Sequence, residues 1–248
     1  MHVEIGKIVK RLPAVTSTNT EAARLIKENR APEGTVILAD FQTHGRGQQG
    51  NQWQSNKGEN ILLSLILYPG FLKAIDQFYL SMAISNAVAG FLLNHTSLVK
   101  IKWPNDIIIG RKKVAGILIE NTLSGPFVST TVAGTGININ QDRFSAKLPN
   151  PTSLKLETNT PFNLDEVFTA LCASLNQYVN MLYNQELVEL KTTYLNYLFG
   201  LNEWKIYVDS AGRFEGCIVD VTSSGMLMVK HRNGAISNYG FKEIAFII

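Results

Sequence analysis

The chain contains few cysteines, few charged residues and no long apolar run. Its two cysteines, Cys172 and Cys217, are too few for a disulfide framework or a zinc site of their own, and both fall in apolar segments that predict buried thiols. Charged residues make up 17% of the sequence, below the roughly 25% of an average globular protein, which excludes a disordered chain. The longest apolar run, residues 61–67, is far shorter than the roughly 20 residues of a membrane span.

The N-terminal segment, residues 1–11, also lacks the apolar stretch of a signal peptide and alternates polar with apolar side chains. The sequence therefore predicts a soluble, cytoplasmic protein without membrane contact. Its net charge of +3 is modest, whereas a nucleic-acid-binding domain usually carries a larger and clustered positive charge. This balance suits an enzyme with anionic small-molecule ligands at least as well.

The 248 residues are enough for one large domain, or for a large domain with a small appendage. Apolar spacing predicts helices over residues 18–29, 72–94, 164–183 and 186–199. Short apolar runs predict strands over residues 35–41, 60–68, 99–103, 106–109, 114–120 and 127–139. Thr18 and Glu21 have the spacing of a capping box at the start of the first helix, and Gly134-Thr135-Gly136 is expected to interrupt the last strand.

From residue 203 onward, the pattern changes to short strands separated by turns. Five strands are predicted, over residues 204–208, 214–221, 226–230, 235–239 and 244–248, and the Asn233-Gly234 pair is typical of a type I′ hairpin turn. Five strands in so short a segment indicate a small β-barrel. We therefore predict an α+β fold divided near residue 200, with one domain over residues 1–200 and a C-terminal barrel over residues 201–248.

Residues 45–50 (GRGQQG) fit the G-x-G-x-x-G pattern of dinucleotide-binding folds. That fold requires a helix directly after the glycines and an acidic residue about twenty positions later, and neither is present, so we reject this interpretation. We predict a long mobile loop, because ordering its residues costs roughly 1–2 kcal/mol each, and such a loop often becomes ordered over a ligand. Arg46 and the backbone N–H groups can then contact an anion, while Trp53 offers a flat apolar surface.

Basic residues gather in a second segment, with five of them between Lys100 and Lys113. Lys100 and Arg111 are interpreted as solvated. Lys113 begins a buried strand, from which a compact ammonium group can point into a pocket and bind phosphate or carboxylate. Asp106 either holds a Mg²⁺ ion that bridges nucleotide phosphates or pairs with a lysine, and the sequence leaves both open.

Gly134-Thr135-Gly136 form a third unusual segment, in which small residues lie inside a predicted strand. Small residues there indicate either the close approach of a ligand or another backbone, or a β-bulge. This segment alone does not decide between the two interpretations.

Together and in this order, the segments resemble those of the biotin–protein ligases. The resemblance rests on Ser17-Thr18-Asn19, Gln42-Thr43-His44-Gly45-Arg46-Gly47, Lys102-Trp103-Pro104-Asn105-Asp106, Lys113 with Ala115-Gly116-Ile117-Leu118, and Gly134-Thr135-Gly136-Ile137-Asn138. It spans about residues 15–140, and the C-terminal barrel matches more loosely, by position and size. The resemblance implies a mixed β-sheet catalytic domain with flanking helices, of the class II synthetase-like biotin/lipoate ligase type, and an SH3-like C-terminal barrel.

The resemblance also implies a reaction in two steps. The carboxylate of biotin attacks the α-phosphate of ATP in the presence of Mg²⁺, which gives biotinyl-5′-AMP and pyrophosphate. A lysine of the biotin carboxyl carrier protein domain of a biotin-dependent carboxylase then attacks the mixed anhydride and releases AMP. The implied ligands and partners are therefore biotin, ATP, Mg²⁺ and the carrier domain, and homodimers also occur in the family.

Site residues implied by the resemblance fall into three groups. Lys113 and Arg46 are expected to be the catalytic cations. The expected biotin-binding residues are Ser17, Thr18, Asn19, Gln42, Arg46, Gly47, Gln48, Lys113 and Gly116. The expected nucleotide-binding residues are Gly45, Arg46, Trp53, Asn105, Asp106 and Asn138, and Asp106 is the expected metal ligand.

Two features depart from the family pattern. Gln48 and Gln49 stand where the glycine loop of relatives often has arginines, so Gln48 is assigned by position only. The Ser-Thr-Asn segment begins at Ser17, which leaves no room for the N-terminal winged helix-turn-helix of some members, and we expect a monofunctional ligase without specific DNA binding. The alternatives are a lipoate–protein ligase, which shares the fold and the acyl-adenylate chemistry, and a non-catalytic nucleotide- or carrier-binding module.

Overall fold

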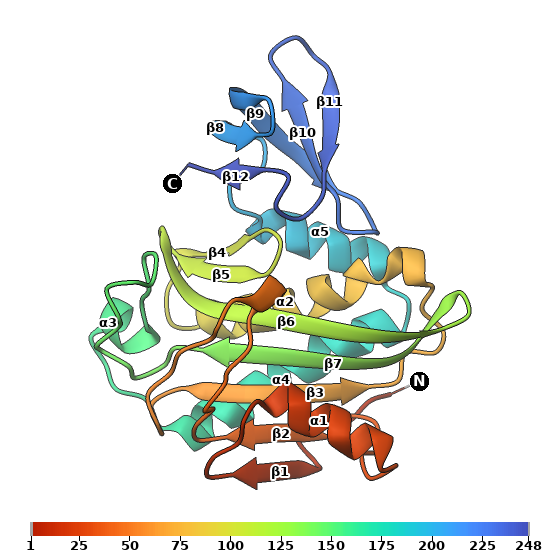
Figure 1. Cartoon of the computed structure of the whole chain (residues 1–248), viewed down its shortest axis with the longest axis vertical. Helices are drawn as coiled ribbons and strands as arrows, with labels where there is room; N and C mark the ends of the chain where they lie inside the picture. Colours follow the sequence, from red (N-terminus) through yellow and green to blue (C-terminus); the bar gives the residue numbers. More distant parts are fainter. Residues whose placement is uncertain (1, 248) are drawn as a thin grey trace.

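The computed structural model describes residues 2–247 and contains two β-sheets (Figure 1). The strands of the first sheet are β1 (Val9–Leu12), β2 (Val36–Ala39), β3 (Ile61–Leu67), β4 (Val99–Lys102), β5 (Asp106–Ile109), β6 (Lys112–Ser124) and β7 (Phe127–Ile137). They are hydrogen-bonded in the order β1-β2-β3-β7-β6-β5-β4. The sheet is mixed, because β1 pairs with β2 in parallel and the other pairs are antiparallel.

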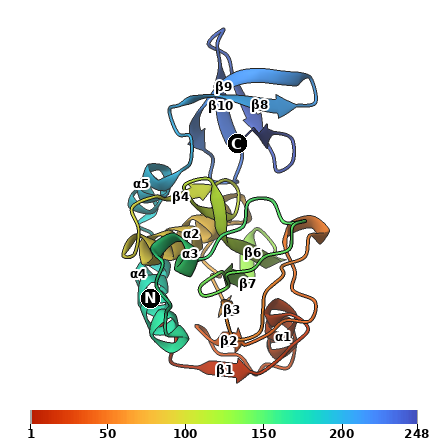
Figure 2. The same cartoon turned by 90° about the vertical axis from the view of Figure 1, so that its left-hand side faces the viewer.

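Helices cover both faces of this sheet. α2 (Phe78–Leu93), α4 (Leu164–Tyr183) and α5 (Leu187–Tyr197) lie together on one face, and α1 (Thr18–Lys27) lies on the other (Figure 2). A short helix, α3 (Leu154–Thr158), and two 3₁₀ turns, η1 (Gln48–Gly50) and η2 (Ala74–Asp76), lie in connecting segments. In residues 2–247, no helix combines the length and the apolarity that a membrane span needs.

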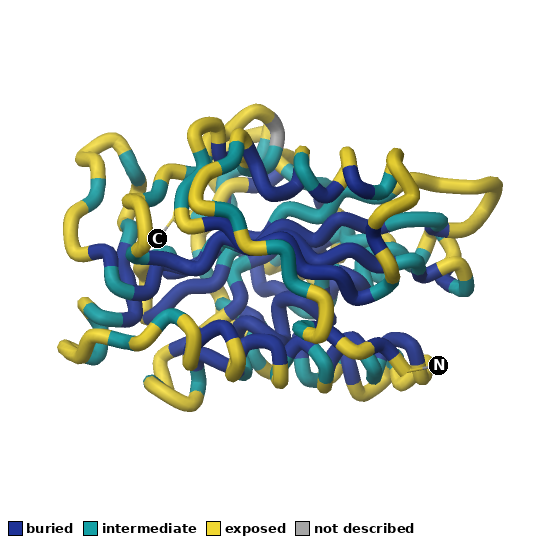
Figure 3. The backbone as a smooth tube through the Cα atoms, turned by 90° about the horizontal axis from the view of Figure 1, so that it is seen from below, coloured by how far each residue is buried: buried dark blue, intermediate teal, exposed yellow. Residues whose placement is uncertain are grey.

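The hydrophobic core is centred on β3. All seven residues of this strand are buried, since it pairs with β2 on one side and with β7 on the other. A strand that is buried on both faces is a continuous apolar run, as β3 is except for Ser64. Figure 3 shows the buried strands at the centre of the molecule, with exposed segments around them. The Ser64 hydroxyl contacts Thr18 and Asn19, the first two residues of α1. The core thus contributes one polar group to the N-terminal turn of that helix.

The second sheet is antiparallel and is formed by the C-terminal strands β8 (Trp204–Asp209), β9 (Gly212–Val221), β10 (Leu227–His231), β11 (Ile236–Tyr239) and β12 (Ala245–Phe246). Their order is β11-β10-β9-β8-β12. In Figure 1 this sheet lies beyond α5 and the β4–β5 hairpin. The Trp103 indole N–H joins the two parts, because it donates a hydrogen bond to the Gly225 carbonyl at 3.0 Å. The predicted α+β class is confirmed, and the boundary near residue 200 stays a prediction.

Some elements differ from the sequence-based expectations. The sequence pattern does not predict β1, which is short and carries two basic residues, or α3, which has five residues. The expected helix over residues 72–94 begins only at Phe78, after η2. The expected break in β7 is wrong: β3 and β6 hydrogen-bond to Gly134-Thr135-Gly136 from both sides, which keeps the strand continuous.

The predicted capping box of α1 is also wrong. The N-cap is Ser17, and the backbone N–H of Thr18 donates to Oε1 of Gln42 at 2.7 Å. Glu21 instead accepts hydrogen bonds from Lys10 of β1 at 2.7 Å and from Arg24 at 2.8 and 2.9 Å. A tertiary contact from the segment after β2 therefore replaces the local cap.

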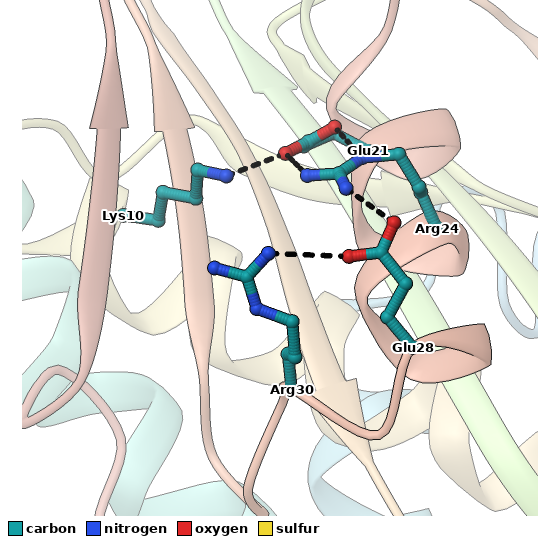
Figure 4. A network of polar contacts seen from close by, with 5 residues as sticks. All are labelled: Lys10, Glu21, Arg24, Glu28 and Arg30. Atoms are coloured by element: carbon teal, nitrogen blue, oxygen red, sulfur yellow. Dashed lines mark hydrogen bonds and ion pairs between the residues drawn. The ribbon is translucent and has the colours of Figure 1, made fainter.

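Figure 4 shows Glu21 in a network of alternating charges beside α1. Arg24 contacts both Glu21 and Glu28, and Arg30 contacts Glu28 at 3.3 Å. The Glu21 side chain is only 13% exposed. Hydrogen bonds from Arg24 and from Lys10 lower its pKa to about 2, although burial acts in the opposite direction. The network thereby fixes α1 against the edge strand β1.

Glu21→Gln should destabilise the protein at neutral pH by about 1 kcal/mol. Because the folded pKa of Glu21 is lower than the unfolded value of 4.5, its carboxylate stabilises the fold above that value and loses this effect as the pH falls toward about 2. Urea unfolding between pH 7 and pH 3 should show a difference from the wild type that shrinks with falling pH. Glu28→Gln is the control, with a smaller effect expected at its more exposed position. A difference that stays constant over this range would contradict the assignment.

Candidate active site

A cavity of about 600 Å³ lies between the start of α1, the loop of residues 44–53 and parts of both sheets. We refer to residues 44–53 as the glycine loop. Strands β3, β6 and β7 line the cavity, and so does the C-terminal segment of residues 241–246. Every residue predicted for the site lines this cavity except Gly45 and Asn138. The fold thus brings together segments that are far apart in the sequence.

One end of the cavity, which we call the polar end, is lined by Ser17, Thr18, Asn19 and Gln42. The first three are buried, and none of the four is charged. Gln42 Oε1 accepts from the Thr18 N–H and lies 3.1 Å from the Thr18 hydroxyl, while Ser64 Oγ lies 2.7 Å from Thr18 Oγ1 and 2.6 Å from Asn19 Oδ1. Within the described chain, the Ser17 hydroxyl makes no capping bond. These fixed donors and acceptors suit a small, uncharged polar group.

The glycine loop forms a hairpin with backbone hydrogen bonds of its own, and its mobility stays a prediction. Gly47 N–H donates to Asn51 O at 2.7 Å, and Trp53 N–H donates to Gly45 O at 2.9 Å. A Cβ atom at Gly45 would overlap the Trp53 carbonyl, so only glycine permits this pairing. The hairpin carries Trp53 to the cavity.

The Trp53 indole lies over the backbone of the β6–β7 pair. A Cβ atom at Gly136 would overlap the indole, and one at Gly116 would be 3.0 Å from Trp53 Cζ3. Two residues before Gly136 on β7, a Cβ atom at Gly134 would overlap the Asn19 side chain. The small residues of this segment therefore permit close approach, and the bulge interpretation is wrong because β7 keeps its register here. Trp53 forms an apolar surface in the middle of the cavity.

Lys113 and Asp106 form an ion pair at the end of the cavity opposite the polar end. Lys113 Nζ lies 2.6 Å from Asp106 Oδ1, and 5.8 Å from the centre of the Trp53 ring. Lys102 lies opposite Asp106 in the β4–β5 pair, and burial lowers the pKa of Lys102, with Lys113 adding to that effect and Asp106 opposing it. Two lysines around a single carboxylate leave a net positive charge. This end of the cavity suits an anion.

Arg46 is not at this positive end. Its guanidinium group donates a hydrogen bond to Oε1 of Glu120, and its side chain is 48% exposed. Glu120 lies seven positions after Lys113 on β6, which corresponds to roughly 20 Å along an extended strand. The two predicted catalytic cations therefore line the same cavity but pair with different carboxylates, Arg46 with Glu120 and Lys113 with Asp106.

The two predicted asparagines have different surroundings. Asn105 lines the cavity, and its Nδ2 donates to Ile117 O at 2.9 Å. Asn138 directly follows β7, is buried and does not line the cavity. Its Nδ2 donates to Thr152 O at 2.9 Å, and its backbone carbonyl accepts from Leu154 N–H at 3.0 Å. Asn138 therefore holds residues 152–154 in place beside the end of β7.

The sequence pattern does not identify the C-terminal residues that line the cavity. These are Phe241, Lys242, Ile244, Ala245 and Phe246. Lys102 Nζ lies 5.5 Å from the centre of the Phe246 ring, so the second sheet covers the positive end. The sequence contains no local signal for this contact, because it joins residues more than a hundred positions apart.

Comparison with known proteins gives a consistent result. Residues 12–138 match the model of the biotin/lipoate A/B protein ligase family. The chain is 30% identical over 224 residues to the bifunctional ligase/repressor BirA of Bacillus spizizenii, which covers 89% of this chain and 69% of that protein. It is 28% identical over 229 residues to the biotin–[acetyl-CoA-carboxylase] ligase of Paracoccus denitrificans, covering 88% of this chain and 92% of the relative.

A solved structure extends the similarity to the whole fold. The biotin protein ligase of Aquifex aeolicus, in complex with biotin and ATP, superposes with a TM-score of 0.78 at 26% identity. The superposition covers 96% of this chain and 98% of the Aquifex chain. The C-terminal sheet is therefore included in the structural similarity.

Gly136→Ala should displace the Trp53 indole from the cavity, because the new methyl group occupies its position. We expect Trp53 to become more accessible to acrylamide quenching. A Trp53→Phe variant of each protein gives the fluorescence of the other two tryptophans, which is subtracted to leave the signal of Trp53. Gly70→Ala is the control, since a Cβ atom there has no neighbour within 4 Å. Equal quenching of wild type and Gly136→Ala would show that the indole does not rest on Gly136.

Proposed function

The chain belongs to the biotin/lipoate A/B protein ligase family, among the biotin–protein ligases, and we propose that it joins biotin to a carrier lysine through biotinyl-5′-AMP. The observation that carries this proposal is the order of groups along the cavity: an uncharged polar end, the Trp53 surface over glycines, and Lys113. Biotin has the same order of groups, with a ureido ring, an apolar ring and chain, and a carboxylate.

Similar proteins support the proposal that biotin and ATP are the two small substrates. The Aquifex aeolicus structure contains biotin and ATP, and its fold matches this chain over nearly its whole length. The Paracoccus denitrificans relative is named a biotin–[acetyl-CoA-carboxylase] ligase. We therefore propose a biotin carboxyl carrier protein domain as the acceptor.

In the first step, the polar end orients biotin and Lys113 acts on its carboxylate. Ser17, Thr18 and Gln42 supply fixed donors and acceptors for the ureido group. The carboxylate oxygen then attacks the α-phosphorus of ATP, and the bond to pyrophosphate breaks. Lys113, which is partly buried, stabilises the negative charge on both reactants.

For the nucleotide, Trp53, Asn105 and Asp106 line the cavity next to Lys113. Among the described residues, Asp106 is the only carboxylate that lines it. Mg²⁺ typically binds one or two carboxylates together with phosphate oxygens and water, so this donor set fits a Mg²⁺ ion shared with ATP. When bound, the ion would neutralise phosphate charge, and Asp106 would exchange its contact with Lys113 for the ion.

In the second step, the neutral amine of the carrier lysine attacks the biotinyl carbonyl and AMP leaves with its electron pair on the phosphate oxygen. The glycine loop limits the access of water to the anhydride before the carrier arrives. A division of the chain near residue 200, homodimer formation and a cytoplasmic location stay predictions.

Mass spectrometry of a carrier domain incubated with this protein, biotin and Mg·ATP tests the proposal. We expect the carrier to gain one biotinyl group, and a carrier whose acceptor lysine is replaced by arginine to gain none. The same reaction with lipoate in place of biotin tests the lipoate–protein ligase alternative. An unmodified carrier without pyrophosphate release would favour a non-catalytic binding module.

Lys113→Ala should reduce biotin-dependent exchange of pyrophosphate into ATP by at least about 100-fold. Its ammonium charge matters most in the transition state, so the affinity for biotin should fall much less, by under roughly tenfold. Lys112→Ala is the matched control: the neighbouring ammonium group points to Glu157 at 3.0 Å and is 57% exposed. Near-normal exchange by Lys113→Ala would refute the assignment.

Gln48→Arg should slow the dissociation of biotinyl-5′-AMP. Gln48 lines the cavity but offers only neutral groups, whereas a guanidinium can add a charge-assisted contact worth roughly 1.5–3 kcal/mol before ordering costs. The measurement is release of the adenylate from the purified complex during a chase with excess biotin, and we expect release about tenfold slower. Gln48→Met controls for size without charge. An unchanged or faster release from Gln48→Arg would show that residue 48 does not face the intermediate.

A further inference from the structure

Glu120 joins two segments that form opposite walls of the active-site region. Its Oε1 accepts a hydrogen bond from the Arg46 guanidinium group of the glycine loop, and its Oε2 accepts from Asn19 Nδ2 at 2.8 Å. Glu120 itself lies on β6, outside the lining of the cavity. Its carboxylate is therefore the link between the start of α1 and the loop.

The Asn19 side of this link is rigid. Asn19 is 3% exposed and its Oδ1 lies 2.6 Å from Ser64 Oγ, which belongs to the fully buried strand β3. The side chain passes over Gly134, where any Cβ atom would overlap it. Asn19 Nδ2 also lies 3.3 Å from Leu118 O. The core and the sheet thus fix the position of one oxygen of Glu120.

The Arg46 side of the link is part of the loop. The backbone of Arg46 pairs with Gln52, and the bonds between Gly45 and Trp53 continue the same hairpin. A surface groove of about 480 Å³ lies between this hairpin and β6, lined by Arg46 and Glu120 among others. Across this groove the ion pair joins the hairpin to β6, in addition to the packing of the Trp53 indole on Gly116 and Gly136.

The exposure of the pair suits a contact that breaks and forms again. The Arg46 side chain is 48% exposed and the Glu120 side chain 37%. An ion pair of this kind contributes only weakly to stability, and salt screens it. A weak tie allows the loop to open for substrates and to close over them.

We propose that Glu120 is a positioning residue that latches the glycine loop over the cavity and so determines how long biotinyl-5′-AMP is retained. Arg46 supplies the loop side of this latch through its contact with Glu120. The inference rests on the proposed function, because retention concerns the intermediate of that reaction.

Hydrogen exchange of the backbone amides of residues 45–53 tests the latch without any substrate. In the full-length protein, Glu120→Gln should accelerate this exchange roughly three- to fivefold. Arg46→Gln should have the same effect, and the double variant should add nothing further. Raising the salt concentration should accelerate exchange in the wild type and leave Glu120→Gln unchanged. Unchanged exchange in Glu120→Gln, or additive effects of the two substitutions, would overturn the latch.

Glu215→Gln is the matched control, because Glu215 pairs with Arg232 in the second sheet with side-chain exposures of 40% and 57%. It should leave exchange in the glycine loop unchanged. If Glu215→Gln accelerated this exchange as much as Glu120→Gln does, the effect would be one of general stability and the latch would be wrong.

Release of biotinyl-5′-AMP tests the consequence for the reaction. Glu120→Gln should release the adenylate several-fold faster than the wild type, while its first-turnover formation at saturating biotin and ATP stays within about twofold. A merely structural role would not separate these two rates. Equal release would overturn the retention role. If the wild type forms no adenylate, the proposed function fails, and the exchange experiment still decides on the latch.

Discussion

Three glycines of the β6–β7 pair, Gly116, Gly134 and Gly136, are the constraint on which the site depends. Asn19 occupies the space above Gly134, and Trp53 occupies the space above Gly116 and Gly136. The two strands hydrogen-bond to each other through these glycines, so their backbone forms the wall of the cavity. Larger residues would hold α1 and the glycine loop away from the sheet, and the polar end and the loop would then no longer share one cavity.

Charge is distributed unevenly along this cavity, and the distribution follows from the sheet. Lys113, the second residue of β6, pairs with Asp106 across the β5–β6 hairpin, whereas Glu120 lies further along the same strand and pairs with Arg46. The four described residues of the polar end carry no charge, and Arg46 of the loop lines the same cavity. A ligand with one anionic end and one neutral polar end is therefore oriented in a single direction by the protein.

The second sheet takes part in the site. Phe246 lies beside Lys102, and the Trp103 indole donates to Gly225, so two neighbouring residues at the end of β4 anchor the C-terminal strands. Covering Lys102 with apolar groups removes water from the ammonium, which lowers its pKa. The small C-terminal domain thus affects the electrostatics of the positive end in addition to its shape.

The sequence alone determined what depends on local spacing: β3 as an apolar run, α4 over its full observed length, the C-terminal hairpins, and most residues that line the cavity. Tertiary structure decided the partners. Gln42 replaces the local cap of α1, Arg46 turns to Glu120, and the C-terminal segment closes over Lys102. Arg46 and Glu120 are 74 positions apart. Spacing in the sequence reports only which face a residue occupies, whereas the partner of a charge depends on which segments the folded core brings together.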